Sequence, residues 1–101
     1  MGMIATPLGT FQFEPYKMEG EWIDEAGVYL FVRTTPGGES EVLYVGLCDS
    51  FKNRMCAHER WEEAVREGAN SVHAAFVSDP ALRQALERHL IAEYQPPLNV
   101  S

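Results

Sequence analysis

Cysteine, membrane-length apolar runs and positive charge are all scarce in this sequence. The two cysteines, Cys48 and Cys56, are too few for a disulfide scaffold and lack the C-x-x-C spacing of a zinc site, so both are predicted to be free thiols. No stretch reaches the roughly 18 apolar residues of a membrane span, and the opening segment MGMIATPLGT lacks the charged and apolar regions of a secretory signal. We therefore expect a cytoplasmic protein with no membrane association.

The scarcity of positive charge restricts how the protein can bind a polyanion. Lys and Arg total 8 against 15 Asp and Glu, a formal net charge of -7, so the overall field repels nucleic acid. Residues 1–41 carry seven acids and two bases, whereas residues 42–101 carry eight acids and six bases. The excess negative charge is therefore N-terminal, and the rest of the chain can still present a local basic face.

The length of the chain fits one globular domain. Its 101 residues, 46% of them hydrophobic, suffice for a single modest core. The sequence contains no repeat, low-complexity tract or linker that would divide it. We therefore expect one domain.

Local patterns predict the order strand, strand, helix, strand, helix. Residues 26–33 and 41–46 are rich in β-branched and aromatic residues and flank a Pro/Gly cluster, which predicts a β-hairpin. The remaining predicted elements are a helix over about 51–66 capped by Asp49 or Ser50, a strand over 71–77, and a helix over about 80–94 behind Ser78 or Asp79 and Pro80. In the first 25 residues, only TFQFE alternates, like a short extra strand.

Three charged or titratable side chains fall where apolar residues are expected. At about 100° per residue, Arg54 and His58 lie within the apolar arc of the first predicted helix, and Glu87 lies within that of the second. A buried carboxylate is costly unless it is paired or bound to a metal. Each of the three therefore needs a partner, and one alternative for Glu87 is an ion pair with Arg83 one turn earlier.

The unusual residues of the hairpin and the first predicted helix can also have purely structural roles. Tyr29 and Tyr44, taken singly, are packing residues more often than catalytic ones. In an antiparallel hairpin, the numbers of two residues that lie opposite each other add up to a constant. If this constant is odd, Tyr29 and Tyr44 lie on the same face of the sheet. Arg54 can extend along the surface, and His58 can bond a backbone group.

The same residues resemble the motifs of one nuclease family. GVY at 27–29 and YVG at 44–46 are similar to the two half-motifs of the GIY-YIG nuclease superfamily, with Val in place of Ile. Arg54 resembles the family's helix arginine, and His58 stands where members have His or Tyr. The segment at 87–100, ERHLIAEYQPPLNV, resembles the closing segment of the N-terminal nuclease domain of bacterial excision-repair excinucleases. The sequence is identified as a member of this superfamily.

Membership implies an α+β fold with a small three-stranded antiparallel sheet flanked by helices. It assigns residues 26–101 to the nuclease-like domain and leaves residues 1–25 as an N-terminal extension, which we expect to pack on the domain away from the cleft. The implied activity is divalent-metal-dependent hydrolysis of phosphodiester bonds in DNA, by a stand-alone endonuclease of low intrinsic specificity related to DNA repair.

The resemblance also assigns residue roles. Glu87 is the expected metal ligand for one Mg²⁺ or Mn²⁺ ion, with water and phosphate oxygens completing the shell. Tyr29 is the expected general base, His58 is its rival, and Arg54 is expected to contact the phosphate. The catalytic set is Tyr29, Tyr44, Arg54, His58 and Glu87; the supporting set is Gly27, Gly46 and Asn99; Lys52 is a further phosphate-binding candidate.

An alternative function remains open at this level. Without an appended DNA-reading module, the choices are a stand-alone nuclease of low specificity, a nuclease that borrows a partner or a second copy of itself, or a noncatalytic nucleic-acid or protein interaction module that keeps the fold. The acidic N-terminal third favours the noncatalytic module. Retention of all five catalytic candidates favours the enzyme. DNA is the expected partner, with RNA as the alternative, and a homodimer or a targeting protein is expected to help such a small domain find its substrate.

Overall fold

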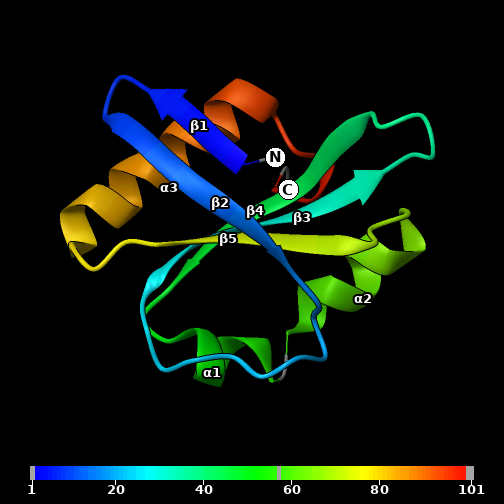
Figure 1. The fold of residues 1–101 in the computed structure, drawn as a ribbon, viewed down its shortest axis with the longest axis horizontal. Helices are drawn as coiled ribbons and strands as arrows, with labels where there is room; N and C mark the ends of the chain where they lie inside the picture. The colour runs from blue at the N-terminus through cyan, green and yellow to red at the C-terminus, as the bar shows by residue number, and fades with distance from the viewer. Residues whose placement is uncertain (1, 57, 100–101) are drawn as a thin grey trace.

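The computed structural model describes residues 2–56 and 58–99. These residues form an antiparallel five-stranded sheet in the order β1-β2-β5-β3-β4, with helices on both faces (Figure 1). The strands are β1 (Gly2–Thr6), β2 (Gly9–Tyr16), β3 (Gly27–Thr34), β4 (Ser40–Cys48) and β5 (Ser71–Phe76). The helices are α1 (Phe51–Met55), α2 (Glu59–Arg66), α3 (Pro80–Tyr94) and the 3₁₀ helix η1 (Pro97–Asn99).

The α+β class is confirmed, but the sheet has five strands rather than the predicted three. Strands β3, β4 and β5 correspond to the three predicted strands, and the hairpin of β1 and β2 extends the sheet beyond β5. Strand β2 pairs with β5 from Glu14 opposite Ala74 to Tyr16 opposite Val72. Only TFQFE signalled a strand in this segment, because a short edge hairpin depends on pairing with distant residues more than on its own pattern.

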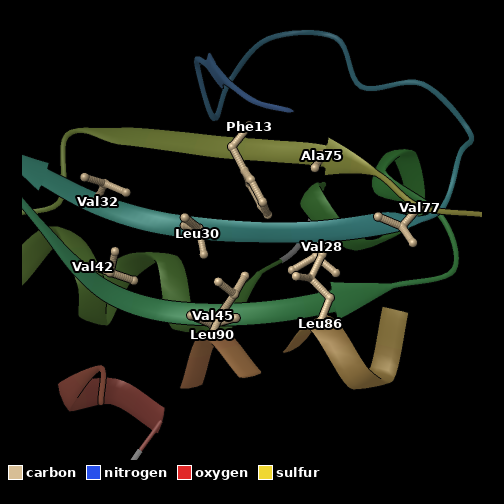
Figure 2. Close-up of a cluster of buried hydrophobic side chains, with 10 residues drawn as sticks. All are labelled: Phe13, Val28, Leu30, Val32, Val42, Val45, Ala75, Val77, Leu86 and Leu90. Carbon is tan, nitrogen blue, oxygen red and sulfur yellow. The ribbon is translucent and has the colours of Figure 1, made fainter. Parts of the chain in front are cut away.

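The two faces of the sheet carry two separate cores. Val28 and Leu30 of β3 pack with Leu86 and Leu90 of α3 on one face (Figure 2). Tyr29, between them in sequence, points to the opposite face, where α1 and α2 lie. The alternation of β3 therefore separates an aliphatic core from an aromatic one.

The register of the β3–β4 hairpin places both tyrosines on the α1 and α2 face. Tyr29 lies opposite Gly46 and Phe31 lies opposite Tyr44, so the numbers of paired residues sum to an odd value. The register shifts directly after this pair and leaves Leu43 as an extra residue in β4. Such a bulge bends the strand and redirects its side chains, and here it adjoins Tyr44.

The prediction of one helix over residues 51–66 is wrong. Helix α1 ends at Met55, and α2 starts at Glu59 behind His58, whose extended backbone (φ -102°, ψ 106°) interrupts the helix. The imidazole of His58 acts as the N-cap by accepting a hydrogen bond from the Arg60 amide. Histidine is not a favoured N-cap residue, so the sequence carries no conventional signal for this break.

The prediction for α3 agrees with the structure. The Asp79 side chain accepts hydrogen bonds from the amides of Ala81 and Leu82, and Pro80 occupies the first turn. Across the described residues, no helix combines the length and apolar character needed to cross a membrane.

Candidate active site

Four predicted site residues meet on the face of the sheet covered by α1 and α2. Tyr29 is only 1% exposed, and its ring centroid lies 6.2 Å from that of Tyr44 and 5.4 Å from that of His58. The Tyr29 hydroxyl oxygen lies 2.6 Å from Nε2 of His58. The guanidinium of Arg54, from the end of α1, lies close enough to this hydroxyl to act on its pKa. The fold therefore assembles a buried phenol, an imidazole and a guanidinium at one place.

Two glycines make room for this arrangement. A Cβ atom at Gly46 would overlap the hydroxyl end of the Tyr29 ring, which lies directly against the β4 backbone. A Cβ atom at Gly27 would overlap the carbonyl oxygen of Ala75 and the ring of Phe51. Both positions therefore require glycine for close approach of neighbouring groups.

Two hydrogen bonds determine the tautomer of His58. Its Nδ1 accepts the Arg60 amide proton at 3.2 Å, so Nδ1 carries no proton of its own. In the neutral ring the proton is therefore on Nε2, which donates to the Tyr29 oxygen. Burial, with a further contribution from the guanidinium of Arg54, lowers the pKa of His58 to about 4. The imidazole is consequently neutral at pH 7, and neither of its nitrogens is free to take a proton from water.

The phenol of Tyr29 is protonated in the free protein. Burial raises the pKa of Tyr29 well above its ordinary value, the neighbouring Tyr44 raises it further, and Arg54 lowers it. Because His58 donates to the oxygen, the Tyr29 proton is not donated to that imidazole. Loss of that proton requires additional positive charge near the phenol.

Arg54 has a partner that the sequence did not indicate. Its two terminal nitrogens lie 3.2 and 3.3 Å from the two carboxylate oxygens of Glu59, the first residue of α2. The spacing of five residues is not one that meets on a continuous helix, so only the break between α1 and α2 creates this pair. The sequence would have indicated the Arg54–Glu59 pair only if the helix break at His58 had been predicted.

Lys52 occupies a different part of the surface. Two residues before Arg54 on α1, it lines hollows with Glu21, Trp22 and Asp24 of the N-terminal segment. Its amide also bonds to the carbonyl oxygen of Ile23. The acidic segment therefore lies beside the predicted phosphate-binding lysine.

Glu87 is half-buried on α3 and lacks a cationic partner among the described residues. The alternative pairing with Arg83 is wrong, because the Arg83 guanidinium bonds to Asp49 at 2.8 Å and to the carbonyl oxygens of Val77 and Ser78. Burial raises the pKa of Glu87. The charge of the neighbouring Arg88 offsets part of this shift, so the carboxylate is partly desolvated and has no ion pair among the described residues.

The side of α3 that carries Glu87 adjoins the free edge of β4. Ile91, one turn after Glu87, lines a hollow with Asn99 of η1. The Asn99 side chain exchanges two hydrogen bonds, of 2.7 and 2.8 Å, with the backbone of Val45, which lies between Tyr44 and Gly46. Within the described chain, however, no hydrogen bond or ion pair joins Glu87 to the four clustered residues.

Glu87 is the one carboxylate that the sequence predicts as a metal ligand. No group of three or more His, Cys, Asp or Glu side chains among the described residues forms a metal cage. A divalent ion at Glu87 would therefore take its other ligands from water and substrate oxygens, as magnesium commonly does.

The structure is similar to solved nuclease domains. It matches the GIY-YIG N-terminal endonuclease domain of UvrC from Thermotoga maritima bound to magnesium, with a TM-score of 0.62 and 26% identity over 78% of this chain and 88% of that chain. The chain has the GIY-YIG fold. This confirms the predicted resemblance and the fold of a metal-dependent nuclease.

Two point mutants of the same GIY-YIG domain, each bound to its catalytic divalent cation, give similar matches. A Tyr-to-Phe mutant has 27% identity and a TM-score of 0.62, and an Asn-to-Ala mutant has 25% identity and a TM-score of 0.63; each covers 79% of this chain and 88% of that chain. No family model and no curated protein matches the sequence. The GIY-YIG assignment therefore comes from tertiary structure and from the motif residues.

Proposed function

We propose that the protein is a divalent-metal-dependent endonuclease that hydrolyses phosphodiester bonds in DNA. One observation carries the proposal: the Tyr29 hydroxyl oxygen lies 2.6 Å from Nε2 of His58 and near enough to the guanidinium of Arg54 for its charge to act on the phenol. Its support is the fold, which is that of UvrC nuclease domains bound to magnesium or another catalytic divalent cation.

Tyr29 is the general base in this proposal, and His58 positions it. A phenolate at Tyr29 gains a hydrogen bond from His58 and attraction from Arg54, both of which favour the charged form. It can then accept the proton of the attacking water. His58 is the weaker candidate for the base, because its Nδ1 caps α2 and its Nε2 already carries a proton.

Arg54 and Tyr44 bind the phosphate side of the site. The planar guanidinium of Arg54 matches two phosphate oxygens and stabilises the charge that develops in the transition state. Tyr44, half-buried beside Tyr29, orients the phosphate or water with its hydroxyl. A divalent cation, Mg²⁺ or Mn²⁺, held by Glu87 would supply charge neutralisation at the phosphate and the leaving oxygen. Gly27 and Gly46 support this geometry by leaving room for close approach, and the Asn99 side chain supports it by holding the β4 backbone at Val45.

The acidic surface favours one alternative, a noncatalytic interaction module. Lys52 lies beside Glu21 and Asp24, and the net charge is -7, so the overall field repels a nucleic acid. In the enzyme interpretation, a second copy of the chain or a targeting protein supplies the missing affinity. RNA is the alternative substrate.

A plasmid-nicking assay with Mg²⁺ or Mn²⁺ separates the two functions. We expect the parent protein to nick supercoiled DNA, Glu87→Gln to lose nicking, and Glu93→Gln, an exposed acid on the same helix, to keep it. If Glu87→Gln nicks as well as the parent, Glu87 is not the metal ligand. If the parent binds DNA but nicks with neither metal, the interaction module is the correct function.

A further inference from the structure

Glu59 presents its carboxylate to Arg54 as a phosphate would. The two Glu59 oxygens lie 3.2 and 3.3 Å from the two terminal nitrogens of Arg54. Two parallel N–H···O bonds to one planar guanidinium are also the geometry of phosphate recognition. In the free protein, the outward-facing donors of Arg54 are therefore already engaged.

The two partners of this pair differ in how firmly they are held. The Arg54 side chain is 31% exposed and adjoins the Tyr29 hydroxyl, whereas the Glu59 side chain is 73% exposed. Among the described residues, the neighbouring Arg60 is bonded to Glu63 and offers Glu59 no second cation. Displacement of Glu59 into solvent therefore breaks one exposed ion pair and leaves Arg54 in place beside Tyr29.

We propose that Glu59 is a built-in competitor that occupies the phosphate position of Arg54 and is displaced when a phosphodiester binds. This inference rests on the proposed function only in taking Arg54 as the phosphate contact. Glu59 would thereby lower the affinity for DNA, so that only substrate held in place, or delivered by a partner, displaces it efficiently. The ion pair between Glu59 and Arg54 depends on the helix break at His58, because this break makes Glu59 the first residue of α2.

Binding of a fluorescently labelled DNA duplex, measured by anisotropy in EDTA, tests the inference without any cleavage. We expect Glu59→Gln to bind about two- to fivefold tighter than the parent, the range set by the net value of an exposed ion pair. The matched control is Glu62→Gln, which removes the same charge from an exposed acid in the same first turn of α2. The gain in DNA affinity for Glu62→Gln should be smaller, because Glu62 makes no bond to Arg54 in the described part of the chain and repels DNA only through long-range charge repulsion, which salt screens.

A double-mutant cycle isolates the competition for Arg54. In an Arg54→Gln background, Glu59→Gln should give no more gain than Glu62→Gln, because there is no guanidinium to release. Thermal unfolding followed by circular dichroism verifies that all variants are folded. Equal gains for the Glu59 and Glu62 variants, or a Glu59 gain that persists without Arg54, would overturn the inference.

The outcomes also separate this inference from the proposed function. Tighter binding by Glu59→Gln without nicking by any variant supports the competitor and refutes the nuclease. Nicking by the parent with unchanged binding by Glu59→Gln refutes the competitor alone. If neither the parent nor Glu59→Gln binds DNA at any accessible concentration, the inference is overturned, because no phosphodiester competes for Arg54.

Discussion

Protonation of His58 should destabilise the fold, because the ring is buried and its Nδ1 caps α2. In the unfolded chain the imidazole titrates near its ordinary pKa of 6.5, whereas burial in the folded protein lowers the pKa to about 4. Between these values the unfolded state binds more protons, so the free energy of unfolding falls as the pH falls from about 6.5 to about 4. At 1.36 kcal/mol for each pKa unit, the loss attributable to His58 is about 3 kcal/mol.

The measurement is urea denaturation at several pH values for the parent and for His58→Asn. Asparagine retains an acceptor for the N-cap but does not titrate in this range. The difference in unfolding free energy between the two proteins should shrink by about 3 kcal/mol between pH 7 and pH 4. His73, whose pKa burial also lowers, is present in both proteins and cancels in the difference. Parallel pH curves for the two proteins would refute the neutral, capping tautomer assigned to His58.

Four further predictions follow from the site geometry. Tyr29→Phe should retain the fold but lower the nicking rate at least about 100-fold, measured on supercoiled plasmid, because the proton acceptor is lost; nicking at the parental rate would exclude Tyr29 as the base. Gly46→Ala should destabilise the protein by about 1–3 kcal/mol in urea unfolding and reduce nicking, because the new methyl group overlaps the Tyr29 ring. Gly37→Ala, where the new methyl group makes only an ordinary contact with Thr35, is its control, and equal effects would argue against the close approach. The carboxyl pKa of Glu59 is lowered to about 2, chiefly by the hydrogen bond from Arg54, and it should rise toward its ordinary value in Arg54→Gln by NMR titration. For duplex DNA, the slope of log affinity against log salt should be near -3 if about three cations reach phosphate, and a much steeper slope would indicate a larger basic face or an oligomer.

Much of the fold could be predicted because its signals are local. The β3–β4 hairpin follows from two β-rich segments around a Pro/Gly cluster, and α3 follows from the Asp79 cap, Pro80 and the apolar stripe with Leu86 and Leu90. The sequence also indicated that two polar side chains lie on apolar helix faces. In the structure His58 is buried, and Glu87 is half-buried without an ion pair among the described residues. These features depend on spacing and side-chain type, which the sequence contains directly.

Features that depend on long-range pairing were not predictable. The β1–β2 hairpin extends the sheet only through its hydrogen bonds to β5, and β1 has no strong pattern of its own. The helix break at His58 depends on one imidazole, which accepts a hydrogen bond from the Arg60 amide while its other nitrogen contacts Tyr29 of β3. The hairpin depends wholly on residues distant in the sequence, and the helix break depends partly on the distant Tyr29.

The sequence by itself determined the chemical inventory and which side chains lie on alternate faces of β3, because the two-residue period of a strand is a local property. The tertiary structure decided which of these side chains interact. The hairpin register placed Tyr44 beside Tyr29, and the N-cap bond determined the tautomer of His58. The break between α1 and α2 allowed Arg54 to bond to Glu59. A hydrogen bond forms only when the donor and acceptor are placed to within a few tenths of an ångström, and such placement is reached only when the separate elements pack together.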